Sequence, residues 1–329
     1  MGAPQEHTQL PMPNGWFAIA MSRDLVRGTV KRARYFAREL VAFRTREGAL
    51  HVLDAYCPHL GAHLGEGGRV MGETIRCPFH GWQYAGDGAC VHIPYSKKDP
   101  PAKARLKSWP VVERNGFVFV WHHDQDEAPT WSIPELPEFS DPRWTEARNL
   151  ELTVPVHIQE MAENNCDPVH FRFVHGNLSS GESSVIPGDE SHYFKAWTRS
   201  VQETALGRFE TELERNTWGL GLVSVAIKGI GEAGLLMLAA TSPVDHTTTH
   251  SRWLFTVTKD MADVAGEDFI AGLGQGVTQD MRIWKNKIHR AAPVLCEADT
   301  ELAFFRKWVR QFYPSAVAPV RGVAAEARA

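Results

Sequence analysis

Two cysteine–histidine pairs constrain the fold of this chain more than any other feature. Residues 57–82 read CPHLGAHLGEGGRVMGETIRCPFHGW, in which 17 residues separate Cys57 and His59 from Cys77 and His80. Each pair lies in a short proline-containing segment, so two loops can each present two ligands. Two sulfurs and two imidazoles suit zinc or an iron–sulfur cluster. Because four ligands complete either site, His63 is interpreted as a loop histidine beside it.

The way in which the ligands are shared distinguishes these metals. Tetrahedral zinc takes all four ligands on one ion, whereas a Rieske [2Fe-2S] cluster takes two cysteines on one iron and two histidines on the other. One cysteine and one histidine from each loop fit a cluster held between two hairpin tips.

The pattern of strands and helices predicts two domains. Residues 16–121 contain short β-rich runs, such as GWFAIAM and GFVFVWHH, split by glycine-containing turns, which predicts a small antiparallel β domain. A polar, proline-rich stretch over 122–145 is typical of a linker. The second half predicts a helical stretch near 157–176, several strands, a long helix over 266–289 and a shorter one over 297–313. Sheet with flanking helices indicates an α+β domain.

Composition excludes several classes of protein. The 329 residues are 43% hydrophobic and 22% charged, with a net charge of −4, as in soluble globular proteins. The absence of a basic excess argues against a nucleic-acid partner. No apolar run reaches membrane-spanning length, so we expect no integral membrane segment. Five scattered cysteines do not form a disulfide framework, and we expect a reduced, cytoplasmic protein.

A second group of candidate ligands lies in ENNCDPVHFRFVHG, residues 163–176. On a helix, Asp167 and His170 share a face. His175, five residues beyond His170, reaches the same point only if the helix ends or is distorted, and Gly176 favours an end there. Two histidines with one carboxylate form the facial triad of non-heme iron enzymes, which leaves coordination positions open.

The carboxylate of such a triad is predicted from an acid on an apolar helix face. In EDFIAGLGQGVTQDMRIWKNKIHR, the apolar residues recur at helical spacing, and Asp280 lies on that stripe three residues after Val277 and four before Trp284. A carboxylate buried among apolar neighbours is costly unless something positive compensates it. A bound iron ion supplies that charge, so Asp280 is the candidate third ligand.

Three of these stretches together resemble Rieske non-heme iron oxygenases. CPHLG followed by CPFHGWQY is similar to their Rieske signature, ENNCDPVHFRFVHG to their iron-binding stretch, and QDMRIWKNKIH to the segment that carries the third ligand. The resemblance implies that Cys57, His59, Cys77 and His80 bind a [2Fe-2S] cluster. It likewise implies that His170, His175 and Asp280 bind a mononuclear Fe(II).

The resemblance also implies an architecture and an assembly. The fold class is α+β: an N-terminal all-β Rieske [2Fe-2S] domain over 12–125, a C-terminal antiparallel-sheet-and-helix (helix-grip) catalytic domain over 126–315, and a flexible tail over 316–329. Asp167 is similar to the aspartate that bridges an iron ligand, here His170, and a cluster ligand, here His80, of a neighbouring subunit. Such a bridge implies a head-to-tail homotrimer.

The implied activity is the hydroxylation or desaturation of an apolar small molecule with O2 as co-substrate, with monooxygenation favoured over dioxygenation. Electrons come from a separate reductase or ferredoxin, so NAD(P)H acts only indirectly. The stretches LDAYCPHLGAHLG, IPY, FVWH and VLCEADTELAFFRKWVRQFY most resemble 3-ketosteroid 9α-hydroxylases and cholesterol 7-desaturases. The chain departs from them in a shorter stretch after His175, where substrate is contacted. A smaller aromatic or heterocyclic substrate is the alternative.

Three further alternatives stay open. Residues 219–240, GLGLVSVAIKGIGEAGLLMLAA, either line an apolar cavity with alternate residues or form plain core, and we favour core. The chain as a whole is alternatively an electron carrier whose second domain only docks a partner, or a zinc-stapled lipid-binding protein.

Overall fold

The N-terminal half consists of three small antiparallel sheets. The computed structural model describes residues 10–176, 182–204, 207–230, 233–272 and 274–314. The sheets have the strand orders β1-β11-β10, β2-β3-β4-β9 and β5-β6-β7-β8. The strands are β1 (Gly15–Met21), β2 (Val30–Tyr35), β3 (Arg38–Arg44), β4 (Leu50–Asp54), β5 (Arg69–Met71), β6 (Thr74–Arg76), β7 (Gln83–Tyr84), β8 (Cys90–His92), β9 (Ser108–Trp109), β10 (Val111–Arg114) and β11 (Phe117–His122).

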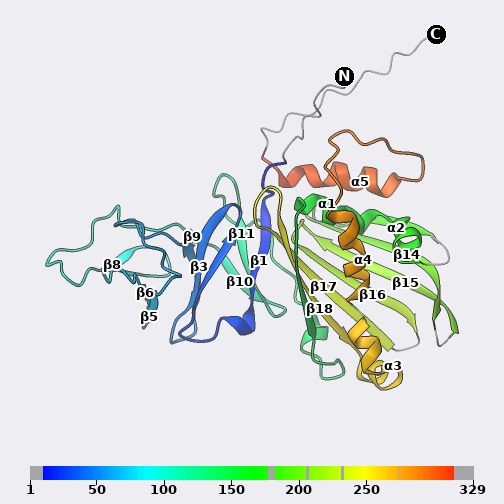
Figure 1. Ribbon diagram of the computed structural model, residues 1–329, viewed down its shortest axis with the longest axis horizontal. Coiled ribbons are helices and arrows are strands. Elements are labelled where there is room, and N and C mark those ends of the chain that lie inside the picture. Colours follow the sequence, from blue (N-terminus) through cyan, green and yellow to red (C-terminus); the bar gives the residue numbers. More distant parts are fainter. Residues whose placement is uncertain (1–9, 177–181, 205–206, 231–232, 273, 315–329) are drawn as a thin grey trace, which may run out of the picture.

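The C-terminal half is built on one antiparallel sheet of seven strands. Its order is β12-β18-β17-β16-β15-β14-β13, and α4 lies across it in Figure 1. The strands are β12 (Arg148–Val154), β13 (Ser183–Pro187), β14 (Tyr193–Thr204), β15 (Gly207–Trp218), β16 (Leu222–Ile230), β17 (Ala233–Pro243) and β18 (Thr249–Val257). The helices are α1 (Ile158–Ala162), α2 (His170–Phe173), α3 (Lys259–Gly272), α4 (Gln275–Trp284) and α5 (Thr300–Trp308). The α+β architecture, with an all-β first half, is as predicted.

Strand β1 joins the two halves. All seven of its residues are buried, because successive side chains enter two different cores. Phe17 and Ile19 pack in one core with Ile158 and Phe305. Trp16 and Ala18 instead pack with residues of the seven-stranded sheet, namely Leu222, Leu238 and Leu254. The halves therefore share their hydrophobic cores.

Polar bonds reinforce this junction. The buried guanidinium of Arg252 donates from Nη1 to the carbonyl oxygen of Ala18 at 3.0 Å and from Nη2 to that of Ile19 at 3.2 Å. Ser242 Oγ donates to the same Ala18 oxygen at 2.7 Å. These bonds run from strands β17 and β18 to the backbone of β1, and so fix the seven-stranded sheet against the N-terminal half.

Two helical predictions were wrong in extent. The helix expected near 157–176 is broken, because Pro168 disfavours helical geometry in the preceding residue, and Asp167 is extended at φ −115° and ψ 94°. The helix expected over 266–289 is two helices, α3 and α4. Gly266 has φ +75° inside α3, a conformation that glycine adopts readily, and α4 ends at Trp284. The tail predicted over 316–329 lies outside the described residues.

Two further observations bear on the class of protein. None of the helices in the described part of the chain is both long and apolar enough to span a lipid bilayer. All five cysteines are free thiols.

Two buried histidines near the domain junction predict acid sensitivity. Burial lowers the pKa of His122 and of His157 to about 4 from the ordinary value of 6.5. The unfolded chain therefore binds two protons near pH 6.5 that the folded chain takes up only near pH 4. The contribution of these neutral histidines to the free energy of unfolding is complete above pH 6.5 and is lost as the pH falls toward 4. By pH 5 this loss is on the order of 1–2 kcal/mol for each histidine.

The variant His122→Asn tests this expectation. His122 donates from Nδ1 to the carbonyl oxygen of Pro13 at 2.9 Å, a bond that asparagine can keep without titrating. Urea unfolding at pH 7 and pH 5 should give a smaller loss of stability for His122→Asn than for the wild type. His92→Asn, at an exposed position, is the control. An equal loss in all three proteins would contradict the assignment.

Candidate active site

The two cysteine–histidine loops have the same backbone design. One joins β4 to β5, and the other joins β6 to β7. In each loop the carbonyl oxygen of the cysteine accepts a hydrogen bond from the N–H group of the glycine four residues later. The N–H group of the same cysteine donates to the carbonyl oxygen of the residue that follows this glycine. These bonds are Gly61 N–Cys57 O 2.9 Å, Cys57 N–Ala62 O 2.9 Å, Gly81 N–Cys77 O 3.2 Å and Cys77 N–Trp82 O 2.7 Å. Gly61 and Gly81 have φ of +76° and +74°, which closes each turn without a Cβ penalty.

The side chains of these loops converge and fit a [2Fe-2S] cluster. The rings of His59 and His80 lie 4.8 Å apart between centroids, and His80 Nδ1 is buried without a hydrogen-bond partner. Cys57 and Cys77 are each 2% exposed. Burial raises the pKa of the Cys77 thiol, so a cation is needed to hold it as thiolate. Two thiols and two imidazoles are the donor set that a Rieske cluster uses, and the unpartnered Nδ1 atom of His80 would complete its hydrogen-bonding or coordination needs there.

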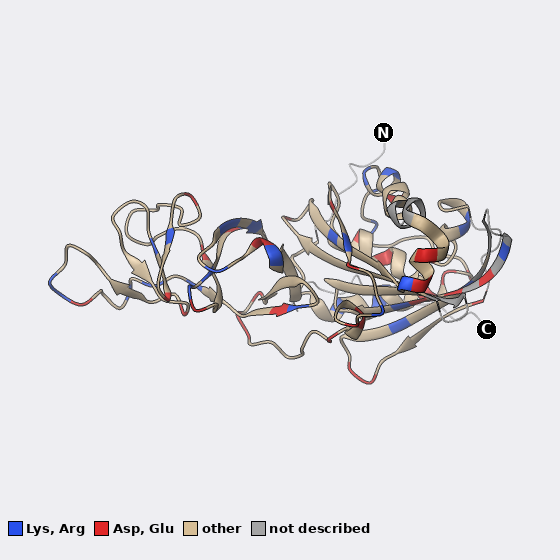
Figure 2. Cartoon of the chain, turned by 90° about the horizontal axis from the view of Figure 1, so that it is seen from below, with Lys and Arg blue, Asp and Glu red and all other residues tan. Residues whose placement is uncertain are grey.

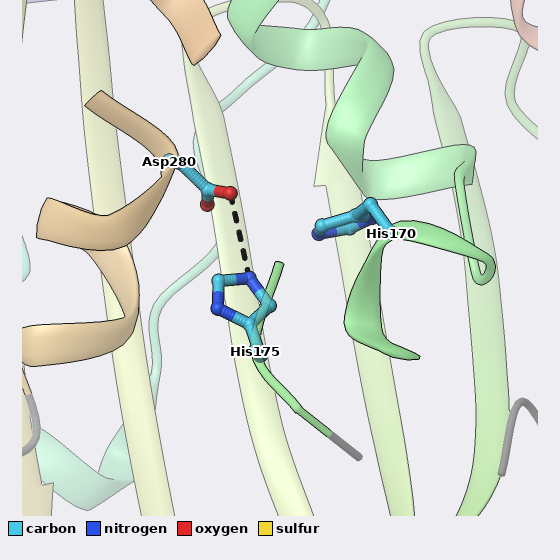
Figure 3. A group of neighbouring side chains, drawn as sticks. All are labelled: His170, His175 and Asp280. Atoms are coloured by element: carbon cyan, nitrogen blue, oxygen red, sulfur yellow. Dashed lines mark ion pairs between the residues drawn. The ribbon is translucent and has the colours of Figure 1, made fainter. Parts of the chain in front are cut away.

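The second group of predicted ligands also comes together. His170, His175 and Asp280 offer ligand atoms that all lie within 4.8 Å of one another. Figure 3 shows the three side chains converging from α2, from the segment after α2 and from α4. Helix α2 ends at Phe173, and Gly176 follows His175 with φ +74°. The predicted helix end therefore allows both imidazoles to reach one point.

Each imidazole of this group is held through its Nδ1 atom. His175 Nδ1 donates to Gln279 Oε1 at 2.9 Å, and its Nε2 faces Asp280 Oδ1 at 3.4 Å. His170 Nδ1 donates to the backbone carbonyl oxygen of Asp167. With Nδ1 engaged in both rings, Nε2 is the nitrogen left to bind a metal, and hydrogen bonds of this kind fix ring orientation in metal sites.

The charge state of the site follows from its surroundings. Asp280 is 8% exposed, and Val277 and Trp284 are its buried neighbours on α4, as the apolar stripe predicted. Burial lowers the pKa of His175, but bonds with Asp280 and Gln279 raise it above the ordinary value overall. Burial lowers the pKa of His170. One buried carboxylate beside two imidazoles is a donor set that suits a divalent iron ion.

Gln279 is a positioning residue that the sequence analysis missed. We expect Gln279→Leu, which removes the acceptor for His175 Nδ1, to weaken mononuclear iron binding by about 10- to 100-fold. Competition against an iron chelator measures this directly. Gln275→Leu, at an exposed position of the same helix, should bind iron like the wild type. Equal iron affinity in both variants would show that Gln279 does not orient the ring.

Asp167 lies beside this group but not on a helix with His170. Its Oδ1 accepts from the backbone N–H groups of Val169 at 3.0 Å and His170 at 3.2 Å, so it caps the start of α2. Its Oδ2 lies 3.9 Å from His170 Nδ1, and its side chain is 39% exposed. The direct bond to the imidazole thus comes from the backbone of Asp167, and its carboxylate remains accessible.

A mostly apolar cavity of about 260 Å³ adjoins the three candidate iron ligands. Val223 and Val225 of β16 and Met237, Ala239 and Thr241 of β17 line it as alternate strand residues. The favoured prediction that residues 219–240 form plain core was wrong at Val223, Val225, Met237 and Ala239, because these side chains, although largely removed from solvent, border the cavity. The other lining residues are Met161, Ala162, Asn164, Asn165, His170, Phe171, His175, Thr198, Leu213, Arg215, Leu220, Trp253, Gly276, Val277, Asp280 and Trp284. The stretch after His175 was predicted to be shorter than in the related hydroxylases and desaturases. Its residues 177–181 lie outside the described residues.

Family models match both halves of the chain. Residues 15–110 match the Rieske [2Fe-2S] domain. Residues 120–313 match the C-terminal domain of 3-ketosteroid 9alpha-hydroxylase. These matches argue against both a zinc-stapled protein and a bare electron carrier, since the second domain is that of a hydroxylase.

Curated relatives agree with this domain pair. A cholesterol 7-desaturase of Ciona intestinalis is 32% identical, over 92% of this chain and 68% of its own length. The oxygenase component of a 3-ketosteroid-9-alpha-monooxygenase of Rhodococcus rhodochrous is 30% identical, over 91% of this chain and 83% of its own length.

Solved structures share the fold. The crystal structure of dicamba monooxygenase bound to dicamba superposes with a TM-score of 0.75 at 20% identity, over 91% of this chain and 97% of that one. The structure of the NdmA QL mutant of Pseudomonas putida CBB5 with theobromine gives a TM-score of 0.73 at 20% identity, over 90% of this chain and 89% of that one. Through its Rieske domain and its hydroxylase-type second domain, the chain belongs to the Rieske non-heme iron oxygenases, in the branch of 3-ketosteroid 9α-hydroxylases and cholesterol 7-desaturases.

Proposed function

We propose that this Rieske oxygenase is the oxygenase component of a monooxygenase, with a mononuclear Fe(II) held by His170, His175 and Asp280. The observation that carries the proposal is the convergence of these three side chains at the wall of an apolar cavity. Three protein ligands leave iron coordination positions open, which O2 chemistry requires. When bound, the iron supplies the reactivity toward O2, and the cavity decides which C–H bond is presented.

Electron supply requires a second protein. Cys57, His59, Cys77 and His80 would hold the [2Fe-2S] cluster. The Rhodococcus rhodochrous relative is named as an oxygenase component, which supports a separate reductase or ferredoxin for this chain as well, with NAD(P)H acting only through it. The potentials of Rieske clusters, roughly −150 to +300 mV, lie above that of a plant-type ferredoxin near −400 mV, so reduction by such a donor is downhill. The five cysteines form no disulfide in the structure, which supports a reducing, cytoplasmic setting.

The substrate class that we favour is steroid-like. The relatives that cover most of this chain are named for a 3-ketosteroid and for cholesterol, and the cavity lining is mostly apolar. A smaller aromatic or heterocyclic substrate is the second candidate, because a cavity of about 260 Å³ lies just below the usual range of roughly 300–1,000 Å³ for ligand pockets.

A homotrimer would bring the two centres together. In Figure 1 the strands β5 and β6, which flank the cluster loops, lie in the N-terminal half, well apart from α2 and α4 in the other half, and Figure 2 shows the same elongated shape from below. Electron transfer within one chain would therefore cross from one half of the molecule to the other. Around the cluster loops, Leu60, Phe79 and Tyr95 are 64%, 60% and 61% exposed, an apolar surface suited to a neighbouring subunit. In a head-to-tail ring, the exposed carboxylate of Asp167 would meet His80 of the partner subunit.

The domain boundaries are part of the proposal. We assign residues 12–125 to the Rieske domain and 126–315 to the catalytic domain. The ranges 15–110 and 120–313 that match the two family models support a division into two domains, with the change between them a few residues before the proposed boundary.

The activity is tested with a surrogate reductase, ¹⁸O-labelled dioxygen and a panel of steroids and small aromatic compounds. We expect one labelled oxygen atom in the product, or an unlabelled desaturated product, from at least one member of the panel. Reduction of the cluster without substrate-dependent O2 uptake across the whole panel would contradict the proposal.

A further inference from the structure

The wall of the cavity contains a buried arginine that the proposed chemistry does not use. Arg215, on β15, lines the cavity and is 3% exposed. Its Nη2 donates to Thr198 Oγ1 at 2.7 Å, but its Nε and Nη1 are buried and have no hydrogen-bond partner. A guanidinium has five N–H donors and no acceptor, so most of its donor capacity is unsatisfied.

The positive charge of Arg215 also lacks a carboxylate partner among the described residues, and its short-range compensation comes from the face of the Phe171 ring. Among the described residues, no carboxylate lies within ion-pairing distance of Arg215, and Glu301 and Asp167 act on it only through longer-range attraction. Burial lowers the pKa of Arg215 to about 10, so it stays protonated at neutral pH. A buried charge without an ion-pair partner is unfavourable, and an anion bound in the cavity would supply that partner.

The position of Arg215 ties it to the candidate iron site. Its Cζ atom lies 5.2 Å from the centroid of the Phe171 ring. That ring is 4.2 Å from the ring of His170 and 5.7 Å from the ring of His175. One aromatic ring therefore separates the guanidinium from the imidazoles that would hold the iron, and a molecule bound by Arg215 lies beside the reacting centre.

Two more unsatisfied donors belong to residues that line the same cavity. Trp253 on β18 and Trp284 on α4 both line it, and the Nε1 atom of each is buried without a partner. An indole N–H only donates. Among the described residues that line the cavity, the buried side-chain atoms without a partner are thus all donors, which a ligand rich in acceptor oxygens would satisfy.

We propose that the substrate of this enzyme is an apolar molecule carrying a carboxylate, and that Arg215 binds this carboxylate through two N–H groups. The inference rests on the proposed function, since it takes the cavity as the substrate site. A carboxylate rather than a ketone is inferred because only an anion neutralises the buried charge, and the planar guanidinium matches a carboxylate in paired hydrogen bonds. The apolar remainder of the molecule packs against the valine and methionine side chains of β16 and β17.

The test is the binding of matched acids and esters to the iron-loaded protein. The probes are lithocholate and its methyl ester for a steroid-sized body, and 2-naphthoate and its methyl ester for a smaller one. Isothermal titration calorimetry should give at least one acid bound about 10- to 100-fold more tightly than its ester, the range for hydrogen bonds to a charged group. Arg215→Met should abolish this preference, and Arg215→Lys should keep part of it.

The control variant is Arg199→Met, at an exposed arginine of β14 that pairs with Glu182 and Glu212. It should retain the full preference for acids. Thermal unfolding and iron content show whether Arg215→Met is folded and loaded, and replacing a buried charge without an ion-pair partner with an apolar side chain is expected to be neutral or stabilising. Equal binding of acid and ester, no binding of either acid, or an unchanged preference in Arg215→Met overturns the inference.

The same assays separate this inference from the proposed function. If Arg215→Met loses the acid preference but no bound acid ever acquires oxygen, the carboxylate site stands and the oxygenation proposal fails. If neutral steroids are oxygenated equally by wild type and Arg215→Met, the oxygenation proposal stands and the carboxylate site fails.

Discussion

Asp280→Ala is expected to purify with its [2Fe-2S] cluster intact, without mononuclear iron, and with oxygenation reduced more than about 100-fold. Loss of a residue that only hydrogen-bonds a metal ligand lowers metal affinity or activity by about 10- to 100-fold, so loss of a ligand itself should cost more. Among the described residues, Asp280 is the only carboxylate grouped with His170 and His175. Iron and acid-labile sulfide analysis should give one iron fewer per chain with unchanged sulfide. Rates of product formation complete the measurement.

Two controls sharpen this result. Asp263→Ala removes an exposed acid from α3 and should leave iron content and activity unchanged. The visible spectrum of the cluster shows whether Asp280→Ala has kept the N-terminal half folded. Full mononuclear iron content in Asp280→Ala would remove this residue from the proposed ligand set.

Asp167→Asn is expected to fold and to bind both metal centres, but to turn over more than about tenfold more slowly. The carboxylate of Asp167 caps α2 through the N–H groups of Val169 and His170, and asparagine caps helices as well as aspartate does. The bond from His170 goes to the backbone of residue 167 and survives the change. What is lost is a negative charge on an accessible oxygen that would link the two centres across a subunit boundary.

Stopped-flow absorbance of the pre-reduced protein, mixed with O2 and substrate, measures the effect. Reoxidation of the cluster should be slow in Asp167→Asn and normal in Asp263→Asn. A mixed assembly tests the subunit boundary itself. Trimers formed from Cys77→Ser chains and Asp280→Ala chains should recover activity that neither parent has, and absence of recovery in verified mixed trimers would contradict transfer between subunits.

Most of the candidate site was predictable because its residues obey local rules. The cluster ligands were found from their spacing alone, which can be read directly from the sequence at Cys57, His59, Cys77 and His80. The position of Asp280 on an apolar helix stripe carries a physical cost that pointed to a compensating ion. The end of the helix before His175 followed from geometry and from Gly176.

What was missed depends on contacts between distant elements. Strand β15 reads as largely polar, and period-two alternation places Leu213, Arg215 and Thr217 on one face. The burial of Arg215 depends on the helices that cover that face, which no local pattern reveals. Gln279 is one of several polar residues on α4, and its role follows only from the approach of His175. The break at Asp167 was predictable from Pro168, but the match of the surrounding stretch to a helical pattern obscured it.

The measurement that tests the central claim most directly is anomalous diffraction from crystals of iron-loaded protein, collected on both sides of the iron edge. We expect a strong single-atom peak bounded by His170 Nε2, His175 Nε2 and the carboxylate of Asp280, with a second peak between the two cysteine–histidine loops. A map with iron at the loops alone, or with the second iron bound by other side chains, would contradict the assignment of these three residues.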